Sequence, residues 1–131
     1  ESTMAPQETV SVKHPGIRLS VNGKYYDVGS DIPPWTTLVD FIREQVHLPG
    51  TKYLCREGGC GVCTLVATIP DLESEGGTKT ISVRACQSLV YNCAGWSIET
   101  IENLGNRHIG YHSLEKALTG FYGTQCGYCS P

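Results

Sequence analysis

Three cysteines lie within the run CREGGCGVC, which extends from Cys55 to Cys63 with Cys60 between them. A fourth, Cys86, follows after a further 22 residues and completes the spacing C-x4-C-x2-C…C. A run this rich in glycine is expected to form a tight loop. If all four cysteines serve one site, the fold has to bring Cys86 back to this loop. Four thiolates at this spacing are typical of a plant-type [2Fe–2S] cluster, two on each iron. The sequence therefore predicts a small domain built around an iron–sulfur loop.

Glycine fills this loop at Gly58, Gly59 and Gly61. Glycine lacks Cβ and enters positive φ freely, so these three residues are expected to supply the backbone angles of a tight curl. The missing side chains also let backbone N–H groups approach the sulfurs. Hydrogen bonds of that kind help to set the potential of a cluster.

Two other uses of the cysteines fit less well. A structural zinc site also takes four cysteines, but usually as two close pairs, whereas the first gap here is four residues. Seven cysteines is an odd number for a disulfide framework, and residues 1–16 lack the apolar core of a signal peptide. Unpaired thiols favour a reducing compartment, so a cytoplasmic location is expected.

Length and charge narrow the possibilities further. A chain of 131 residues allows one domain, or one small domain with part of another. Its net charge of −3 argues against non-specific nucleic-acid binding. No apolar run approaches the 18 residues of a membrane span, so no membrane partner is expected.

An α+β layout follows from the pattern of apolar residues. Residues 1–15 are polar and are expected to form a flexible arm. The dipeptide Asn22-Gly23 is a strong two-residue hairpin signal, and Thr37–Val46 has the spacing of one helix face, with Thr36 or Thr37 as its N-cap. One helix across a small mixed sheet is an α+β arrangement. Strands are expected at Ile17–Val21, Lys24–Val28, Thr64–Ile69, Lys79–Arg84 and Ser97–Ile101.

The pattern changes from Asn103 onward. A glycine-containing linker leads to Ser113, a plausible N-cap with Glu115 in the first turn, and Gly123 is expected to end this helix. Cys126-x2-Cys129 follows, a short ligand pair that alone fits zinc, a redox dithiol or half of a second cluster. The helical context beside the first loop favours half of a second cluster. The apolar face of the helix consists of Leu114, Ala117, Leu118 and Phe121.

Three further residues are candidate ligands. His108 and His112 could bind a metal, but no helix signal places them on one face. Cys93 follows Cys86 too late to replace it and is expected to be a buried apolar cysteine.

Four segments, CREGGCGVCT, RACQSLV, TIENLGN and TQCGYCSP, occur in this order. Together they resemble the N-terminal iron–sulfur region of the molybdenum hydroxylases, the xanthine dehydrogenase and aldehyde oxidase family. The resemblance covers roughly residues 17–131, and TQCGYCSP separates this family from ordinary plant ferredoxins. Within the family the sequence looks closer to eukaryotic aldehyde oxidases, with insect ones among the candidates.

The resemblance implies two cluster-binding units. A β-grasp ferredoxin domain over residues 16–102 would hold the first cluster, with Cys55 and Cys60 on one iron and Cys63 and Cys86 on the other. Residues 103–131 would be a linker and the truncated beginning of a four-helix-bundle [2Fe–2S] domain. Cys126 and Cys129 would supply half of the second site, and a later Cys-x-Cys element beyond Pro131 would supply the rest.

The resemblance also implies a function. In this family electrons pass from a molybdopterin centre through both clusters to FAD, and then to oxygen or NAD. The chain would be the electron-transfer module of such an oxidoreductase, which oxidises aldehydes or aza-heterocycles and is usually a homodimer. The module would have no catalytic residues and would not turn over substrate alone. The alternative is a truncated ferredoxin-like fragment with one cluster, or one that binds a partner through its apolar helix.

Overall fold

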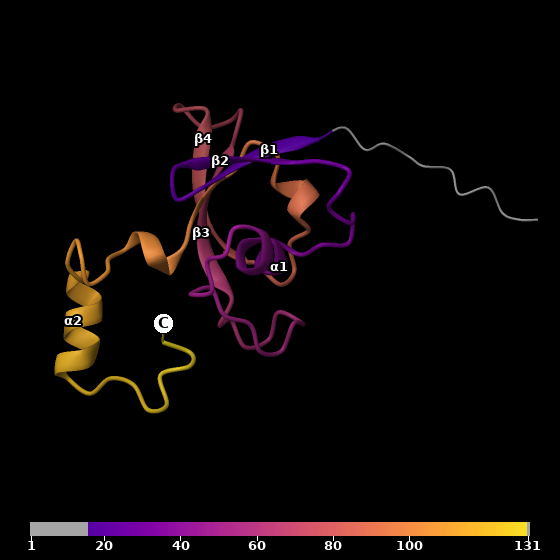
Figure 1. Cartoon of the computed structure of the whole chain (residues 1–131). Coiled ribbons are helices and arrows are strands. Elements are labelled where there is room, and N and C mark those ends of the chain that lie inside the picture. The colour runs from indigo at the N-terminus through magenta and orange to yellow at the C-terminus, as the bar shows by residue number, and fades with distance from the viewer. Residues whose placement is uncertain (1–15, 131) are drawn as a thin grey trace, which may run out of the picture.

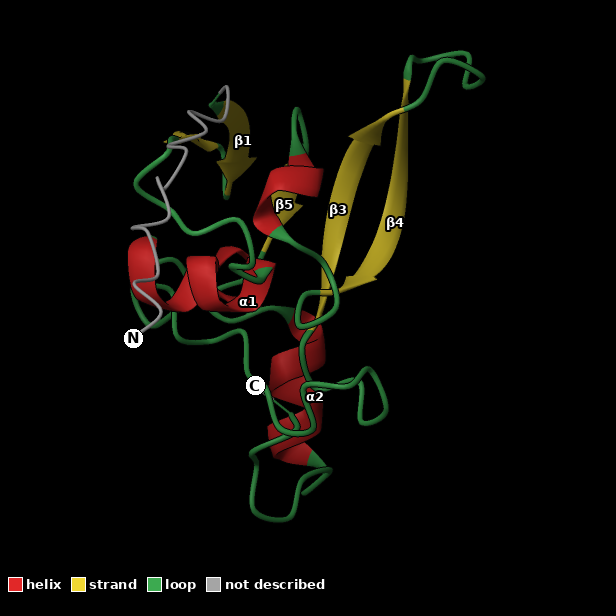
Figure 2. Ribbon diagram, turned by 90° about the vertical axis from the view of Figure 1, so that its right-hand side faces the viewer, coloured by secondary structure: helices red, strands yellow, loops and turns green. Residues whose placement is uncertain are grey.

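The computed structural model describes residues 16–130, so the expected arm over residues 1–15 lies outside the described residues. A five-stranded sheet in the order β2-β1-β5-β3-β4 forms its centre, with α1 beside it (Figure 1, Figure 2). The last strand, β5, pairs parallel to β1 and antiparallel to β3, and so joins two antiparallel hairpins. The predicted α+β fold is confirmed. The strands are β1 (Ile17–Val21), β2 (Lys24–Val28), β3 (Thr64–Pro70), β4 (Thr78–Arg84) and β5 (Ser97–Glu99).

The first hairpin turns at the predicted dipeptide. Asn22 and Gly23 have φ values of 51° and 79°, which is the left-handed conformation that a two-residue turn requires. The side chain of Asn22 also reaches the end of β5, where its amide donates to Thr100 Oγ1 at 2.9 Å and its Oδ1 accepts from the Thr100 N–H at 2.9 Å. β5 is consequently shorter than predicted, because Thr100 bonds to this side chain and a 3₁₀ turn, Ile101–Asn103, follows.

The helical segment after β2 begins where the sequence indicated but is wound differently. Thr37 caps it, since its Oγ1 accepts from the N–H of Asp40 at 3.3 Å. Helix α1 (Leu38–Asp40) then passes directly into a π-helical turn, η1 (Phe41–Gln45). The buried residues here include Leu38, Phe41 and Ile42, which the apolar spacing had placed on the inner face, so that spacing did not reveal the wider turn.

The core lies between the sheet and this helical segment. Phe41 from η1 meets Tyr26 from β2 edge-on, with ring centroids 6.3 Å apart. Around these rings lie fully buried aliphatic side chains: Leu19, Val21, Val28, Leu38, Val39, Ile42, Val90 and Ile98. Burial of each of them contributes about 1.5–3 kcal/mol to the stability of the fold.

The C-terminal stretch contains one further helix, α2 (Ser113–Gly120), which stands apart from the sheet (Figure 1). Its N-cap is His112 rather than the predicted Ser113. His112 Nδ1 accepts from the N–H of Leu114 at 3.2 Å, and Glu115 Oε2 accepts from the N–H of His112 at 2.6 Å. The helix also ends at Gly120, earlier than the predicted Gly123.

Burial ends before this helix begins. Between residues 101 and 130 no residue is buried, and the apolar side chains of α2 face outward. Among the described residues no helix is long and apolar enough to cross a membrane.

Candidate metal centre

The predicted cysteine loop joins the helical segment to β3 and curls below α1 in Figure 1. Gly58 and Gly61 have φ values of +79° and +74°, as expected for glycines in a tight curl. Gly59 does not have a positive φ, so the expectation fails for that residue; the third left-handed residue of the loop is Arg56, with φ of 57°. The chain therefore reverses at positions on both sides of Cys60.

One pair of thiols lies on the outer side of this loop. The backbone N–H of Cys60 points at Cys55 Sγ, 3.3 Å away. That N–H, helped by the N–H of Glu57, lowers the pKa of Cys55 to about 6. Cys55 is half-buried and Cys60 is exposed. The loop thus stabilises a thiolate at this sulfur, which is the form that binds a metal.

A second pair of thiols lies on the inner side. Cys63 and Cys86 are buried, with 2% and 6% of their surface exposed. The N–H of Ala85 donates to the Cys63 carbonyl at 3.2 Å, which brings the end of β4 to the end of the loop. Burial raises the pKa of Cys63, and its contact with Cys86 contributes to the shift. The fold therefore returns Cys86 to the loop, as the spacing predicted.

The four thiols accordingly form two contacting pairs. Within residues 16–130, no three His, Cys, Asp or Glu side chains gather closely enough to hold a single ion. Two pairs of cysteines, one with an N–H array directed at sulfur and one buried, match the donor set of a [2Fe–2S] cluster, which takes two thiolates per iron. The residues present fit that group.

Polar side chains that the sequence did not single out hold the loop against α1. Arg56 binds the carboxylate of Asp40 with two nitrogens, at 2.8 and 3.1 Å. Burial opposes ionisation of Asp40, but hydrogen bonds from Arg56 and Thr37 outweigh it and lower its pKa. Gln87 also contacts the loop, and its amide donates to the Arg56 carbonyl at 2.8 Å. Only its position directly after Cys86 could have drawn attention to Gln87.

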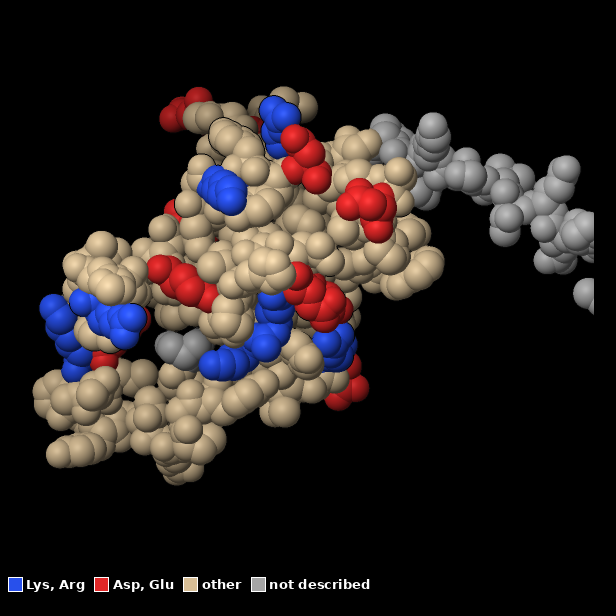
Figure 3. Space-filling view, in the orientation of Figure 1, with Lys and Arg blue, Asp and Glu red and all other residues tan. Residues whose placement is uncertain are grey.

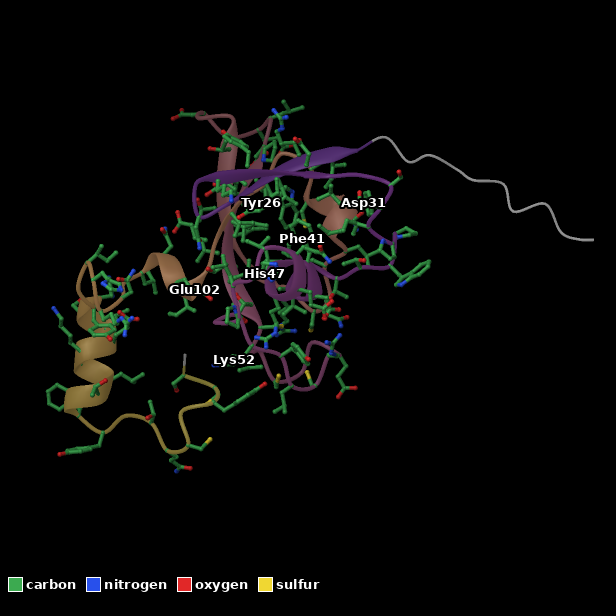
Figure 4. The ribbon with its side chains drawn as sticks, in the orientation of Figure 1. Tyr26, Asp31, Phe41, His47, Lys52 and Glu102 are labelled. Carbon is green, nitrogen blue, oxygen red and sulfur yellow. The ribbon has the colours of Figure 1, made fainter. Side chains whose placement is uncertain are left out.

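The segment before Cys55 is a contact point for the C-terminal stretch. Two guanidinium groups lie over the ring of Tyr53, with the guanidinium carbon of Arg56 3.9 Å and that of Arg43 5.2 Å from the ring centroid. The hydroxyl of Tyr128 donates to the carbonyl of Tyr53 at 2.6 Å, and Lys52 Nζ lies 5.6 Å from the Tyr128 ring. Lys52 is labelled in Figure 4, where it lies between η1 and the C-terminal tail.

This contact lies within the second cysteine pair. Tyr128 is between Cys126 and Cys129 in the sequence, and its hydroxyl bonds to Tyr53, two residues before Cys55. Both thiols are exposed, and among residues 16–130 they do not gather with other His, Cys, Asp or Glu side chains into a group that could hold a metal ion.

The remaining candidates lie outside the site. Cys93 is fully buried, burial raises its pKa to about 12, and its thiol lies 3.4 Å from the Leu89 carbonyl, in line with the prediction of a buried apolar cysteine. His112 uses its Nδ1 as a helix cap, and His108 Nε2 accepts from Arg107 Nε at 3.2 Å.

Charges around the loop are mixed. In Figure 3, basic side chains near the middle of the visible face lie beside acidic ones rather than forming a continuous patch. The arrangement agrees with the small net charge of −3. It gives no basic surface for a nucleic acid on that face.

Comparison with known proteins identifies a family to which most of the described sheet and the cysteine loop belong. Residues 21–91 match the model of the 2Fe-2S iron-sulfur cluster binding domain. This range includes all four paired cysteines and excludes the Cys126–Cys129 pair.

Similar curated proteins are plant enzymes. The chain is 37% identical to an indole-3-acetaldehyde oxidase of Zea mays and 38% identical to a probable aldehyde oxidase 4 of Oryza sativa subsp. japonica. These matches cover 86% and 85% of this chain but only 8% and 13% of the relatives. The chain therefore spans a small part of the length of these relatives.

Solved structures of similar fold are bacterial. Quinoline 2-oxidoreductase from Pseudomonas putida 86 superposes with a TM-score of 0.70 at 31% identity, over 88% of this chain and 63% of that one. The aldehyde oxidoreductase of Desulfovibrio gigas gives 0.71 at 32% identity, over 90% of this chain and 12% of that one.

Proposed function

The chain belongs to the family of 2Fe-2S iron-sulfur cluster binding domains, and on that premise we propose that it is the electron-transfer module at the front of an aldehyde oxidase-type molybdenum hydroxylase. The observation that carries the proposal is the meeting of Cys63 and Cys86 beside the Cys55–Cys60 contact. The names of the relatives, aldehyde oxidases and oxidoreductases, support the kind of parent enzyme.

In this proposal each contacting pair serves one iron. Cys55 and Cys60 bind the outer iron, and Cys63 and Cys86 bind the inner one. When bound, the cluster accepts and releases single electrons. The chain's own groups adapt the site to that charge: the N–H of Cys60 stabilises the Cys55 thiolate, and burial of Cys63 and Cys86 excludes water from the inner side.

The exposure of the two pairs suggests a direction for electron exchange. Cys60 lies at the surface, whereas Cys86 is buried against the core. Electron transfer falls off with distance, so an outside donor or acceptor exchanges electrons through the exposed edge of the loop. No proton transfer or nucleophile is needed for that step, and we assign no catalytic residue.

We further propose that the chain divides into residues 16–102, which hold the first cluster, and residues 103–131, which begin a second cluster domain. Cys126 and Cys129 are two of its four ligands, and a later part of the parent supplies the other two. The contact of Tyr128 with Tyr53 supports this arrangement, because it joins the residue between Cys126 and Cys129 to the segment directly before Cys55.

The rest of the parent enzyme is part of the same proposal. Electrons from a molybdopterin centre reach FAD through the two clusters, in a cytoplasmic homodimer that oxidises aldehydes or aza-heterocycles. Kinship with insect enzymes in particular stays a prediction.

A second candidate rests on the exposed helix. Leu114 of α2 and Phe121, the residue that follows this helix, have 70% and 86% of their surface exposed, which is unusual for an apolar helix face. A ferredoxin-like protein with a single cluster could use this face to bind a partner without any enzyme activity.

The proposal is tested by reconstituting the chain with iron and sulfide. We expect a brown protein with about two irons per chain and a rhombic EPR signal on reduction, as one [2Fe–2S] cluster gives. A colourless protein that binds one zinc per chain would contradict it.

A further inference from the structure

The amide nitrogen of Gln87 faces three acceptors of the candidate metal centre. It lies 2.8 Å from the carbonyl oxygen of Arg56, 3.4 Å from that of Cys86 and 3.8 Å from Cys86 Sγ. Because only acceptors surround it, the NH2 group and not the amide oxygen must occupy this position. One of its hydrogens is directed at the Arg56 carbonyl, which leaves the other for Cys86.

Gln87 connects two parts of the loop that are distant in sequence. Arg56 directly follows Cys55, and Gln87 directly follows Cys86. A single side chain therefore links the residue after one outer ligand to an inner ligand. The backbone N–H of Gln87 donates to the Arg84 carbonyl at 3.0 Å, which fixes the turn from which this side chain starts.

Packing holds the side chain in place. A Cβ atom on Gly58 would lie 3.2 Å from Cγ of Gln87, so the positive-φ glycine of the loop leaves just enough room for the glutamine stem. The stem and the loop backbone thus fit closely, and the amide has little freedom to turn away from the sulfur.

We propose that Gln87 is a positioning residue of the cluster: it fastens the loop to the end of β4 and donates a hydrogen bond to Cys86 Sγ. The inference rests on the proposed function, since it assigns a role toward the cluster bound by these thiolates. A donor at a ligand sulfur stabilises the added negative charge of the reduced state and so raises the reduction potential. The bond to Arg56 slows opening of the loop and retains the iron.

The test compares the reconstituted chain with Gln87→Leu, which keeps the bulk and removes the donor. We expect a lower midpoint potential in redox titration, and release of iron to a chelator that is faster by about two- to tenfold, the effect of one lost hydrogen bond. Gln45→Leu is the matched control, because it makes the same change at an exposed position at the end of η1. The control is expected to leave both measurements unchanged.

A spectroscopic measurement separates the hydrogen bond to sulfur from a purely structural role. With 15N in the glutamine amides, pulsed EPR of the reduced chain should show a 15N coupling that disappears in Gln87→Leu and persists in Gln45→Leu. The wild-type spectrum alone keeps the inference testable if Gln87→Leu folds poorly. Gln87→Glu, of nearly the same shape, should lower the potential further because it places a negative charge beside Cys86.

Each outcome decides one of the two claims. A wild-type chain with the cluster signal but no 15N coupling, or equal potentials for the wild type and both Gln87 variants, would overturn the role of Gln87 and leave the proposed function intact. A wild-type chain without any iron–sulfur signal would overturn both.

Discussion

The two cysteine-bearing regions of this chain differ in what surrounds them. The first, around Cys55 to Cys86, rests on a sheet whose strands bury a common core, and two of its thiols are part of that core. The second, Cys126 and Cys129, follows a helix with no buried residue. A sequence can therefore contain metal ligands that the surrounding structure does not bring together, because the segments that carry the ligands must bury apolar surface against each other to hold them in place.

The largest effect expected from this difference is on the cluster itself. Cys60→Ser removes a proposed ligand of the first site, and we expect loss of the visible absorption and of most of the iron. Cys93→Ser is the control: Cys93 is fully buried with its thiol directed at the Leu89 carbonyl, so its variant should stay brown. Absorption spectra and iron analysis of both variants measure this, and a colourless Cys93→Ser would overturn the ligand assignment.

The next effect concerns stability. Ile98 is fully buried in β5 between the two hairpins, so Ile98→Ala should lower the free energy of unfolding by about 2–5 kcal/mol. Leu114 on α2 is 70% exposed, and Leu114→Ala should change it by less than about 0.5 kcal/mol. Urea titration followed by tryptophan fluorescence gives both values. If both variants lost the same free energy of unfolding, Leu114 would have to be buried against another part of the protein.

A smaller effect tests the contact between the two regions. Tyr128→Phe removes the hydroxyl that donates to the Tyr53 carbonyl, which should weaken docking of the tail by about 0.5–1.5 kcal/mol. Hydrogen exchange of the amides around Tyr128 should become faster as a result. Tyr122→Phe is the matched control, because Tyr122 is 92% exposed. If the two variants exchange alike, the hydroxyl does not hold the tail.

The smallest effect is expected at the second pair. Cys126→Ser should leave the iron content and colour of this chain unchanged, because two thiolates do not complete a cluster. Iron analysis beside the wild type measures this. Loss of half the iron would show that a second cluster forms here and that the two regions are more alike than their packing indicates.

Local signals in the sequence predicted the first region well. Asn22-Gly23 specified its turn by itself, since few residues tolerate positive φ, and the cysteine spacing placed the loop. The winding of Phe41–Gln45 could not be predicted in this way, because the buried Phe41 and Ile42 also fit the inner face of an α-helix. Pairing decided the end of β5: Thr100 leaves the ladder for the side chain of Asn22, which is distant in sequence.

The N-cap of α2 was missed for a different reason. Ser113 has the better side chain for a cap, but Glu115 stands three residues after His112 and completes a reciprocal pair of hydrogen bonds there. The spacing to the glutamate was the more informative signal. Gln87 and Arg56 had no comparable signal, because their roles depend on which backbone atoms the fold brings near them.

The position of β5 also bears on how the protein is made. Among the strands of residues 16–130 it comes last in chain order, and it lies at the centre of the sheet, between β1 and β3. Before Ser97 and the rest of β5 have been synthesised, no strand joins the two hairpins, and the sheet on which the cysteine loop rests is incomplete. Iron that is delivered after β5 has emerged would therefore meet a completed sheet that buries Cys63 and Cys86, whereas iron delivered earlier would meet a sheet that still lacks its central strand.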